Sequence, residues 1–348
     1  MPNTLQSPPQ QVQNGVSDDL LITAHAAMLA GRHFNQQASN LAKQGYMGAY
    51  PSSLGQEACQ VAAALALEPA DWLFPTYRDS VAVMSRGIDL AEVLSPFHGS
   101  SHCGYAPTKT HTAPEATPLA THTAHAVGLA MAAKFAGDST VALAMCGDGS
   151  TSEGDFHEAL NLAAVFEAPV VFLVQNNGYA ISTPVSRQMR AASIAAKGEG
   201  YGMPAYQVDG NDFEQVYPRL HEAVERARAG GGPTLIEAMT YRMGPHTTSD
   251  NPDRYRSREE VEQWRGRDPL TRIQHQMYQR LPNAKTHIEN AILAAEKIAS
   301  EARTSMMQLQ MPNPQDLFAH VYANPPATLS AVAEEYAQQH AAQNGENA

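Results

Sequence analysis

Residues 140–182 read TVALAMCGDGSTSEGDFHEALNLAAVFEAPVVFLVQNNGYAIS, and this stretch decides the fold. Two short apolar runs, TVALAMC and APVVFLVQ, flank a segment in which Phe156, Leu160, Ala163 and Ala164 share one helical face. Runs that are apolar on both faces and joined by a helix predict neighbouring parallel strands covered by helices. The stretch therefore predicts a strand, helix, strand unit.

Flanking segments extend this pattern into a whole domain. AYQVDG (205–210) and PTLIEAMTYR (233–242) predict two further strands, with a helix between about 213 and 229. Residues 18–43 predict one or two amphipathic helices, and Ser53 followed by Gln56 predicts a capped helix start. We predict an α/β domain over 18–330, a doubly wound parallel sheet flanked by helices, with helical N- and C-terminal extensions.

The two ends differ in composition from this domain. Residues 1–17 predict a disordered tail and 331–348 a similar polar tail, because both are rich in polar residues and poor in apolar ones. The C-terminal piece of the domain, from about 284, is predicted to be helical.

Charge and cysteine content exclude several classes of function. The 348 residues carry a formal net charge of -12, which argues against a surface that neutralises nucleic-acid phosphates. Cys59, Cys103 and Cys146 form no CxxC pair, so neither a disulfide framework nor a thiolate zinc site is predicted. No apolar run approaches the length of a bilayer span and the start lacks signal-peptide features. We expect a cytoplasmic protein with neither nucleic-acid nor membrane partners.

Polar loops follow the two strands of the opening stretch. Ligands of open parallel sheets bind beyond the carboxyl ends of the strands, so Asp148 and Asn177 are expected to meet there. A carboxylate and an amide oxygen suit Mg²⁺ that completes its octahedron with water and a ligand's phosphates. Gly147 and Gly149 would let the backbone approach a diphosphate, and Ser150 with Glu153 matches a capping box whose free amides face the anion.

Simpler or better-known motifs compete with the metal site as explanations of this loop. Gly and Asp are common in plain turns between a strand and a helix. A Rossmann fingerprint would require glycine where Ser152 stands, and a phosphate loop of the Walker type would require a Gly-Lys pair that is missing. The pairing of two polar loops, each after a buried strand, favours the metal site.

Seven segments together resemble one enzyme family. Besides residues 147–182, they are YPSSLGQEA (50–58), LFPTYRDS (73–80), TPLATHTAHAVG (117–128), YGMPAYQVDGND (201–212), YRMGPHTTSDNPDRYRS (241–257) and VYANPP (321–326). In this order they resemble the alpha subunit of the decarboxylating component of 2-oxo acid dehydrogenases, the pyruvate and branched-chain complexes. The resemblance runs from about 20 to 330 and implies a thiamine-diphosphate-binding fold.

The resemblance assigns roles to individual residues. It implies that Asp148, Asn177 and the backbone carbonyl of Tyr179 hold Mg²⁺, which in turn holds the diphosphate of thiamine diphosphate. Tyr77 and Arg78 match diphosphate contacts, although Arg78 alone would be taken for a surface ion pair. Further cofactor contacts implied by the family lie in the glycine loop and beside the rings: Gly147, Gly149, Ser150, Thr117, Leu119 and Ile181.

His246 matches the active-site histidine of a flexible loop, which orients intermediates and assists acyl transfer to lipoyl. Neighbouring loop residues are expected to form ion pairs that order the loop when cofactor binds: Arg242, Asp250, Tyr255 and Arg256. Two positions depart from the family. Thr247 replaces a serine that is phosphorylated in animal members, and Gln175 replaces an arginine that some branched-chain members place near the diphosphate.

Five other histidines are candidates for a metal cluster: His98, His102, His111, His122 and His125. Their spacings match no standard zinc pattern, so we expect mostly loop residues. His122 and His125 are candidates for the cofactor entrance.

The resemblance also implies partners. The glutamate that protonates the cofactor's pyrimidine comes from a separate beta chain, so two alpha and two beta chains are expected to form the working unit. The acyl group would pass to a lipoyl-bearing dihydrolipoyl acyltransferase core. Overall likeness favours pyruvate as the substrate. A branched-chain 2-oxo acid such as 3-methyl-2-oxobutanoate, an acetoin-cleaving relative and a non-catalytic scaffold subunit are the alternatives.

Overall fold

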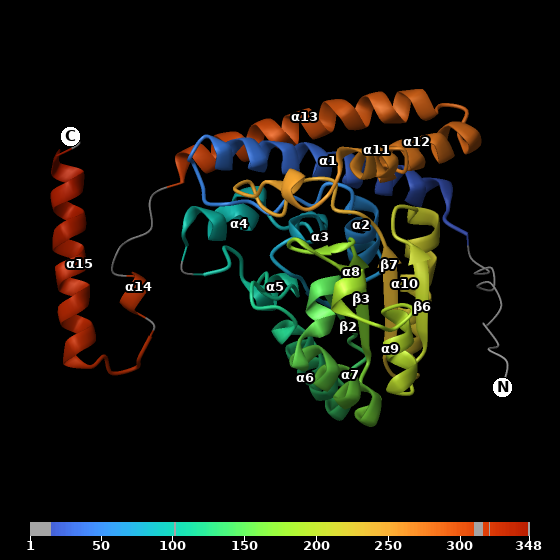
Figure 1. Ribbon diagram of the computed structural model, residues 1–348, viewed down its shortest axis with the longest axis horizontal. Coiled ribbons are helices and arrows are strands. Elements are labelled where there is room, and N and C mark those ends of the chain that lie inside the picture. Colours follow the sequence, from blue (N-terminus) through green and yellow to red (C-terminus); the bar gives the residue numbers. More distant parts are fainter. Residues whose placement is uncertain (1–14, 101, 310–315, 320, 347–348) are drawn as a thin grey trace.

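A sheet of five parallel strands forms the centre of the protein (Figure 1). The computed structural model describes residues 15–100, 102–309, 316–319 and 321–346. The strands lie in the order β1 (Trp72–Phe74), β2 (Ala142–Gly147), β3 (Val170–Asn176), β7 (Thr234–Met239) and β6 (Ala205–Asp209). The predicted parallel α/β sheet is confirmed, and β2 and β3 are neighbours as the opening stretch implied.

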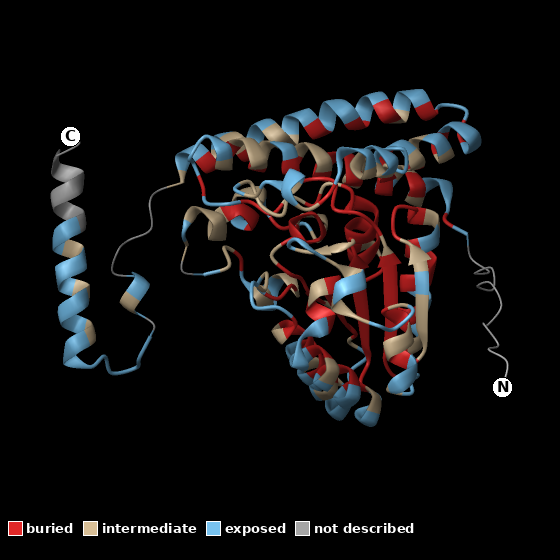
Figure 2. Cartoon of the chain, viewed as in Figure 1, coloured by how far each residue is buried: buried red, intermediate tan, exposed pale blue. Residues whose placement is uncertain are grey.

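Alternation along the central strands explains why their sequences are apolar throughout. Leu143 and Met145 of β2 belong to one core cluster, whereas Ala142, Ala144 and Cys146 belong to a second one on the other face. Both faces of the sheet are therefore buried, as Figure 2 shows by the red strands in the middle of the molecule.

Helices cover the two faces of the sheet as the doubly wound fold requires. The first cluster includes residues of α1 (Asp18–Lys43), α2 (Glu57–Leu65), α10 (Phe213–Arg228), α12 (Pro269–Arg280) and α13 (Ala284–Gln308). The second includes residues of α6 (Thr121–Ala136) and α7 (Gly154–Phe166). Shorter elements complete the chain: α3 (Ser80–Ser85), α4 (Leu90–Leu94), η1 (Ser95–His98), α5 (Pro107–Thr110), η2 (Asp148–Ser152), β4 (Tyr179–Ala180), β5 (Thr183–Pro184), α8 (Val185–Gln188), α9 (Ala195–Gly200), η3 (Pro252–Arg254), α11 (Arg258–Arg265) and α14 (Asp316–Ala319).

Both predicted tails need correction at their inner ends. Val16 is buried and the Ser17 side chain accepts a hydrogen bond from the Leu20 N–H, so the end of the expected 1–17 tail begins the fold. Residues 1–14 lie outside the described residues. The polar tail expected at 331–348 lies largely within a helix, α15 (Ala327–Glu346), which stands apart from the body in Figure 1.

The predicted cap at Ser53 is wrong. Helix α2 begins at Glu57, and its N-cap residue Gln56 makes no side-chain capping hydrogen bond. The Ser53 hydroxyl instead donates to the Arg78 carbonyl at 2.7 Å. The hydroxyl thus ties the segment before α2 to the residues that follow β1.

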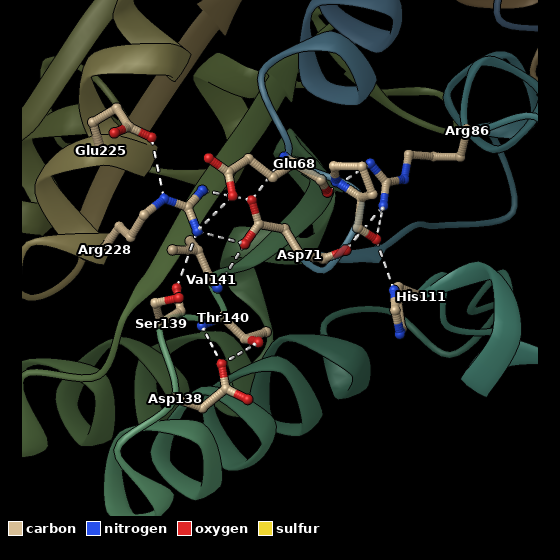
Figure 3. A network of polar contacts seen from close by, with 11 residues as sticks. Glu68, Asp71, Arg86, His111, Asp138, Ser139, Thr140, Val141, Glu225 and Arg228 are labelled. Carbon is tan, nitrogen blue, oxygen red and sulfur yellow. Dashed lines mark hydrogen bonds and ion pairs between the residues drawn. The ribbon is translucent and has the colours of Figure 1, made fainter.

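A polar network fastens the amino ends of β1 and β2 (Figure 3). Asp71 is fully buried and accepts from both terminal nitrogens of Arg228, at 3.0 and 2.7 Å, and from the Val141 N–H at 2.9 Å. Arg228 also donates to the Ser139 carbonyl. The network joins the end of α10 to the sheet edge opposite the carboxyl ends, so it supports the sheet and lies away from the polar loops that follow the strands.

Among the described helices, none combines the length and apolar character needed to cross a membrane.

Candidate functional site

The register of the sheet brings the two predicted loops together. Gly147 pairs with Gln175 across β2 and β3, so the residues that follow emerge side by side. Asp148 accepts a hydrogen bond from the Asn177 N–H at 3.2 Å through Oδ1, and from the Gln188 side-chain amide at 2.9 Å through Oδ2. Burial raises the pKa of the Asp148 carboxyl above its ordinary value. A carboxylate in such surroundings favours a bound cation.

The oxygen atoms available here fit a hard cation. The Asn177 Oδ1 accepts from the Tyr179 N–H at 3.4 Å, so amide oxygen and main-chain carbonyl lie in one turn beside Asp148. No cluster of three His, Cys, Asp or Glu that could hold a metal occurs among the described residues. One carboxylate, one amide oxygen and one carbonyl suit Mg²⁺, which keeps water and phosphate oxygens as further ligands. The Tyr179 carbonyl accepts from Arg242 at 3.2 Å here.

The glycine loop differs in detail from its prediction. A Cβ on Gly147 would meet nothing within 4 Å, which leaves room for a ligand against its backbone. A Cβ on Gly149 would lie 2.8 Å from the Ala180 Cβ, so this glycine is needed for packing of the β4 turn. The capping box is wrong, because Ser150 lies within η2 and α7 starts after Glu153, whose side chain makes no cap.

Buried guanidinium groups face this loop region. Arg78 is 5% exposed and donates to the Ser52 carbonyl at 2.9 Å and to His246 Nδ1 at 3.0 Å. Arg242 is 1% exposed and donates to the carbonyls of Tyr179 and Ile181. Neither arginine forms an ion pair with any described carboxylate, so the surface-pair alternative for Arg78 is wrong. Two buried guanidinium groups that form no direct ion pair within the described residues suit a polyanionic ligand.

His246 is held in one tautomer by these arginines. Its Nδ1 lies 3.0 Å from Arg78 Nη2 and 3.3 Å from Arg242 Nη1, and guanidinium nitrogens only donate. The Nδ1 atom therefore accepts, and the ring proton is on Nε2. Burial, together with the Arg78 and Arg242 charges, lowers the pKa of His246 to about 4.

The segment that carries His246 is ordered without the expected ion pairs. Asp250 accepts from the His246 N–H at 2.8 Å and from the Tyr255 hydroxyl at 2.5 Å. Arg256 donates to the carbonyls of Arg242, Met243 and Gly244. The terminal nitrogens of Arg242 and Arg256 donate mainly to main-chain carbonyls, and neither arginine forms an ion pair within the described residues.

Comparison with known proteins gives the family. The family model for the dehydrogenase E1 component matches residues 25–315. The chain belongs to the dehydrogenase E1 component family. The chain is 45% identical over 318 residues to the 3-methyl-2-oxobutanoate dehydrogenase subunit alpha of Mycobacterium tuberculosis (strain H37Rv), covering 91% of this chain and 87% of that one.

Relatives named for pyruvate also match this E1 chain. It is 40% identical over 265 residues to the pyruvate dehydrogenase E1 component subunit alpha of Acholeplasma laidlawii, covering 76% of this chain and 77% of that one. The protein of the same name from Staphylococcus aureus (strain N315) is 37% identical over 315 residues, covering 87% and 85%. The resemblance to 2-oxo acid dehydrogenase alpha subunits is therefore confirmed.

Several residues that were predicted to lie beside the cofactor rings are open to solvent in this E1 chain. Leu119 is 39% exposed, Ile181 is 57% exposed and Thr117 is also exposed. Ile181 has a φ of 55°, which is unusual for a β-branched residue, and its carbonyl accepts from Arg242 at 2.6 Å. Tyr77 lies edge-on to the His246 ring, at 6.2 Å between ring centroids.

The other histidines do not form a metal cluster in the described part of this E1 chain. His122 is buried, and its Nε2 lies 2.5 Å from the Met145 carbonyl, so it packs under β2 instead of lining an entrance. His125 is exposed on α6, and His111 contacts the Pro69 carbonyl through Nδ1.

Sequence reasoning missed two amide side chains at the site. Gln188 binds Asp148, and the Gln56 Oε1 accepts from the Asn177 side-chain amide at 3.3 Å. Gln56 stands in the quoted segment YPSSLGQEA, where it was assigned to a helix start. A glutamine carries no pattern of its own that would have revealed either contact.

Proposed function

We propose that this E1 alpha chain binds thiamine diphosphate through Mg²⁺ held by Asp148, Asn177 and the Tyr179 carbonyl. With a beta subunit, in a unit of two alpha and two beta chains, it catalyses oxidative decarboxylation of a 2-oxo acid. The acyl group passes to lipoyl on a dihydrolipoyl acyltransferase core. The observation that carries the proposal is the contact of Asp148 with Asn177 at the tips of adjacent strands, beside two buried arginines that form no direct ion pair within the described residues.

The protein groups have separate tasks in this proposal. When bound, the cofactor supplies a nucleophilic carbon and an electron sink for decarboxylation. Arg78 and Arg242 neutralise the diphosphate, since each has carbonyl or imidazole partners and no carboxylate to displace. His246 presents its Nε2–H as a hydrogen-bond donor to substrate oxygen, because its Nδ1 accepts from the arginines. Leu119 and Ile181 supply apolar surface that excludes water from the rings.

A further part of the proposal concerns the substrate, that is, which side chain the 2-oxo acid carries. The sequence favoured pyruvate, and relatives named for pyruvate match at 40% and 37% identity. A specific observation favours a branched-chain acid, because a relative named for 3-methyl-2-oxobutanoate matches at 45%. The two substrates differ by two methyl groups, which a pocket separates only modestly. Release of carbon dioxide from both acids, compared as kcat/KM, decides between them.

We also propose a cytoplasmic setting. Cys59, Cys103 and Cys146 are all free thiols, and Cys59 and Cys146 are buried, as expected for a reducing compartment.

Asp148→Ala tests the metal role in the assembly formed with the co-expressed beta subunit. The variant should lose Mg²⁺-dependent thiamine-diphosphate binding by tenfold or more, and carbon dioxide release with it. Asp138→Ala is the control, because Asp138 is an exposed aspartate before β2, at the opposite edge of the sheet. Unchanged cofactor affinity in Asp148→Ala would refute the proposed site.

A further inference from the structure

A buried row of side-chain amides connects Asp79 to Asn177. The Gln175 Nε2 donates to Asp79 Oδ1 at 2.7 Å, and the Gln56 Nε2 donates to Gln175 Oε1 at 2.8 Å. The Asn177 Nδ2 in turn donates to Gln56 Oε1 at 3.3 Å. All four residues are at most 5% exposed, so water has little access to these hydrogen bonds. Each amide in the row donates in one direction and accepts from the other.

Asp79 fixes the direction of the whole row. Its Oδ2 accepts from the Thr76 N–H and hydroxyl, both at 2.8 Å, and its Oδ1 accepts from Gln175 and Gln60. Burial raises the pKa of Asp79, but the Thr76 N–H can only donate, and the Arg78 carbonyl fixes the Gln60 nitrogen as a donor, so both oxygens of Asp79 accept. The nitrogen of Gln175 must therefore point to Asp79, and its oxygen must point away toward Gln56.

This polarity decides which end of the Asn177 amide faces the proposed metal. The two ends of an amide have nearly the same shape, so packing alone does not choose between them. Because Gln175 presents oxygen to Gln56, Gln56 presents its own oxygen to Asn177. The Asn177 nitrogen is then engaged, and its Oδ1 is free on the other side, where the Tyr179 N–H also approaches it. A reversed amide would turn NH₂ toward a cation and could not bind it.

We infer that Asp79, Gln175 and Gln56 are positioning residues that turn the Asn177 oxygen toward Mg²⁺. The inference rests on the proposed function, because it assigns these residues a purpose only if Asn177 is a metal ligand. It also gives Gln175 a role, because Gln175 transmits the polarity of Asp79 to Gln56. Removal of residues that hydrogen-bond to a metal ligand without touching the metal typically changes metal affinity 10- to 100-fold.

Gln60 offers a matched control for Gln56. Both glutamines belong to the start of α2, both are at most 1% exposed, and both donate to Gln175 Oε1. Gln60 otherwise contacts Asp79 and the Arg78 carbonyl and makes no hydrogen bond to Asn177. Methionine at either position keeps the approximate volume and removes the amide.

The experiment uses the full chain assembled with its beta subunit and measures binding by calorimetry. Thiamine diphosphate is titrated at a series of Mg²⁺ concentrations, and the melting temperature of each unliganded assembly is recorded. Gln56→Met should weaken apparent Mg²⁺ affinity about tenfold or more, whereas Gln60→Met should change it less than about threefold. Gln56→Glu should recover most of the loss, because a buried carboxylic acid can donate to Gln175 and accept from Asn177 as the amide does.

The outcomes separate this inference from the proposed function. If the wild-type assembly bound thiamine diphosphate without any dependence on Mg²⁺, the proposed site would be wrong and the positioning role with it. If the wild-type assembly required Mg²⁺ and Gln56→Met had the same apparent Mg²⁺ affinity, only the positioning role would be wrong. Equal losses in Gln56→Met and Gln60→Met, or no recovery in Gln56→Glu, would indicate a general packing effect and would also overturn the inference.

Discussion

Glu115 carries a carboxyl group that is buried, although the residue as a whole is only partly buried. Neither carboxyl oxygen makes a hydrogen bond of standard geometry within the described residues, and the Ser80 hydroxyl beside it lowers the pKa of Glu115 by less than burial raises it. Burial raises the pKa of Glu115 to about 8, with the charge of Asp79 adding to the effect. The native protein therefore keeps this proton up to about pH 8, whereas an unfolded chain releases it near its ordinary pKa of 4.5.

This difference predicts a specific pH dependence of stability. Between pH 4.5 and about 8 the unfolded state binds fewer protons at Glu115, so this residue lowers the free energy of unfolding as pH rises. In wild type, Glu115 should lower the free energy of unfolding by up to about 1.4 kcal/mol for each pH unit in this range, and Glu115→Gln should abolish that decrease. Urea unfolding of wild type and Glu115→Gln at pH 6 and 9 measures this difference in the free energy of unfolding. Glu158→Gln, at an exposed position, is the control. Equal pH slopes in wild type and Glu115→Gln would contradict the prediction.

His246 should remain neutral well below its ordinary titration range. Its lowered pKa of about 4 means that unfolded His246 binds a proton between about pH 4 and 6.5 and native His246 does not. The residue thus contributes stability that is present above pH 6.5 and lost as pH falls toward 4. Nitrogen-15 NMR of the imidazole in the free chain should show the Nε2–H tautomer from pH 7 down to about 5. If the His246 imidazole instead titrated with a midpoint near pH 6.5, its contacts with Arg78 and Arg242 would be excluded.

The proposed ligand residues and the residues that support them differ in how far sequence can predict them. Asp148 and Asn177 could be paired because each follows an apolar strand, and strand ends meet at one sheet edge. Gln56 and Gln188 could not be found in this way. Their contacts depend on where the α2 start and the segment after β5 lie in space, which no local pattern specifies.

Among the elements, strands and long helices were predicted better than helix starts. The limits of α10 and the start of α13 agree with the predictions because apolar periodicity persists over several turns. The two capping boxes failed because Ser53 donates to the Arg78 carbonyl and Ser150 lies in a 3₁₀ turn. A hydroxyl near a helix start has competing partners, and only the tertiary structure chooses among them.

The segment 242–257 depends on one arginine for its order. Arg256 is 7% exposed and donates to three consecutive carbonyls, a fork that lysine cannot reproduce. Arg256→Lys should increase chymotrypsin cleavage within this segment several-fold and lower stability by about 1–3 kcal/mol. Exposed Arg254→Lys is the control. Cleavage at the wild-type rate would show that other contacts suffice to order the segment.

At the scale of the whole molecule, the two halves of the proposed cofactor site are unequal. The groups assigned to metal and diphosphate are buried: Asp148, Asn177, Arg78 and Arg242. The residues assigned to the rings, Leu119 and Ile181, are exposed. The resemblance implied only that a glutamate of the site comes from a beta chain, and it did not predict this difference in burial. It follows physically that the rings require a second surface to exclude water.

This asymmetry predicts how the isolated chain binds ligands. Mg²⁺ with inorganic diphosphate should bind the isolated chain and the assembly with similar affinity, within about threefold, because its proposed contacts all lie on this chain. Thiamine diphosphate should bind the assembly at least about tenfold more tightly, because burial of Leu119 and Ile181 against the rings adds apolar contact only there. Calorimetry with both ligands on both forms tests this. Equal affinity of the two forms for thiamine diphosphate would mean that this chain alone encloses the cofactor, and a loss of diphosphate binding in the isolated chain would mean that the partner also builds the anion site.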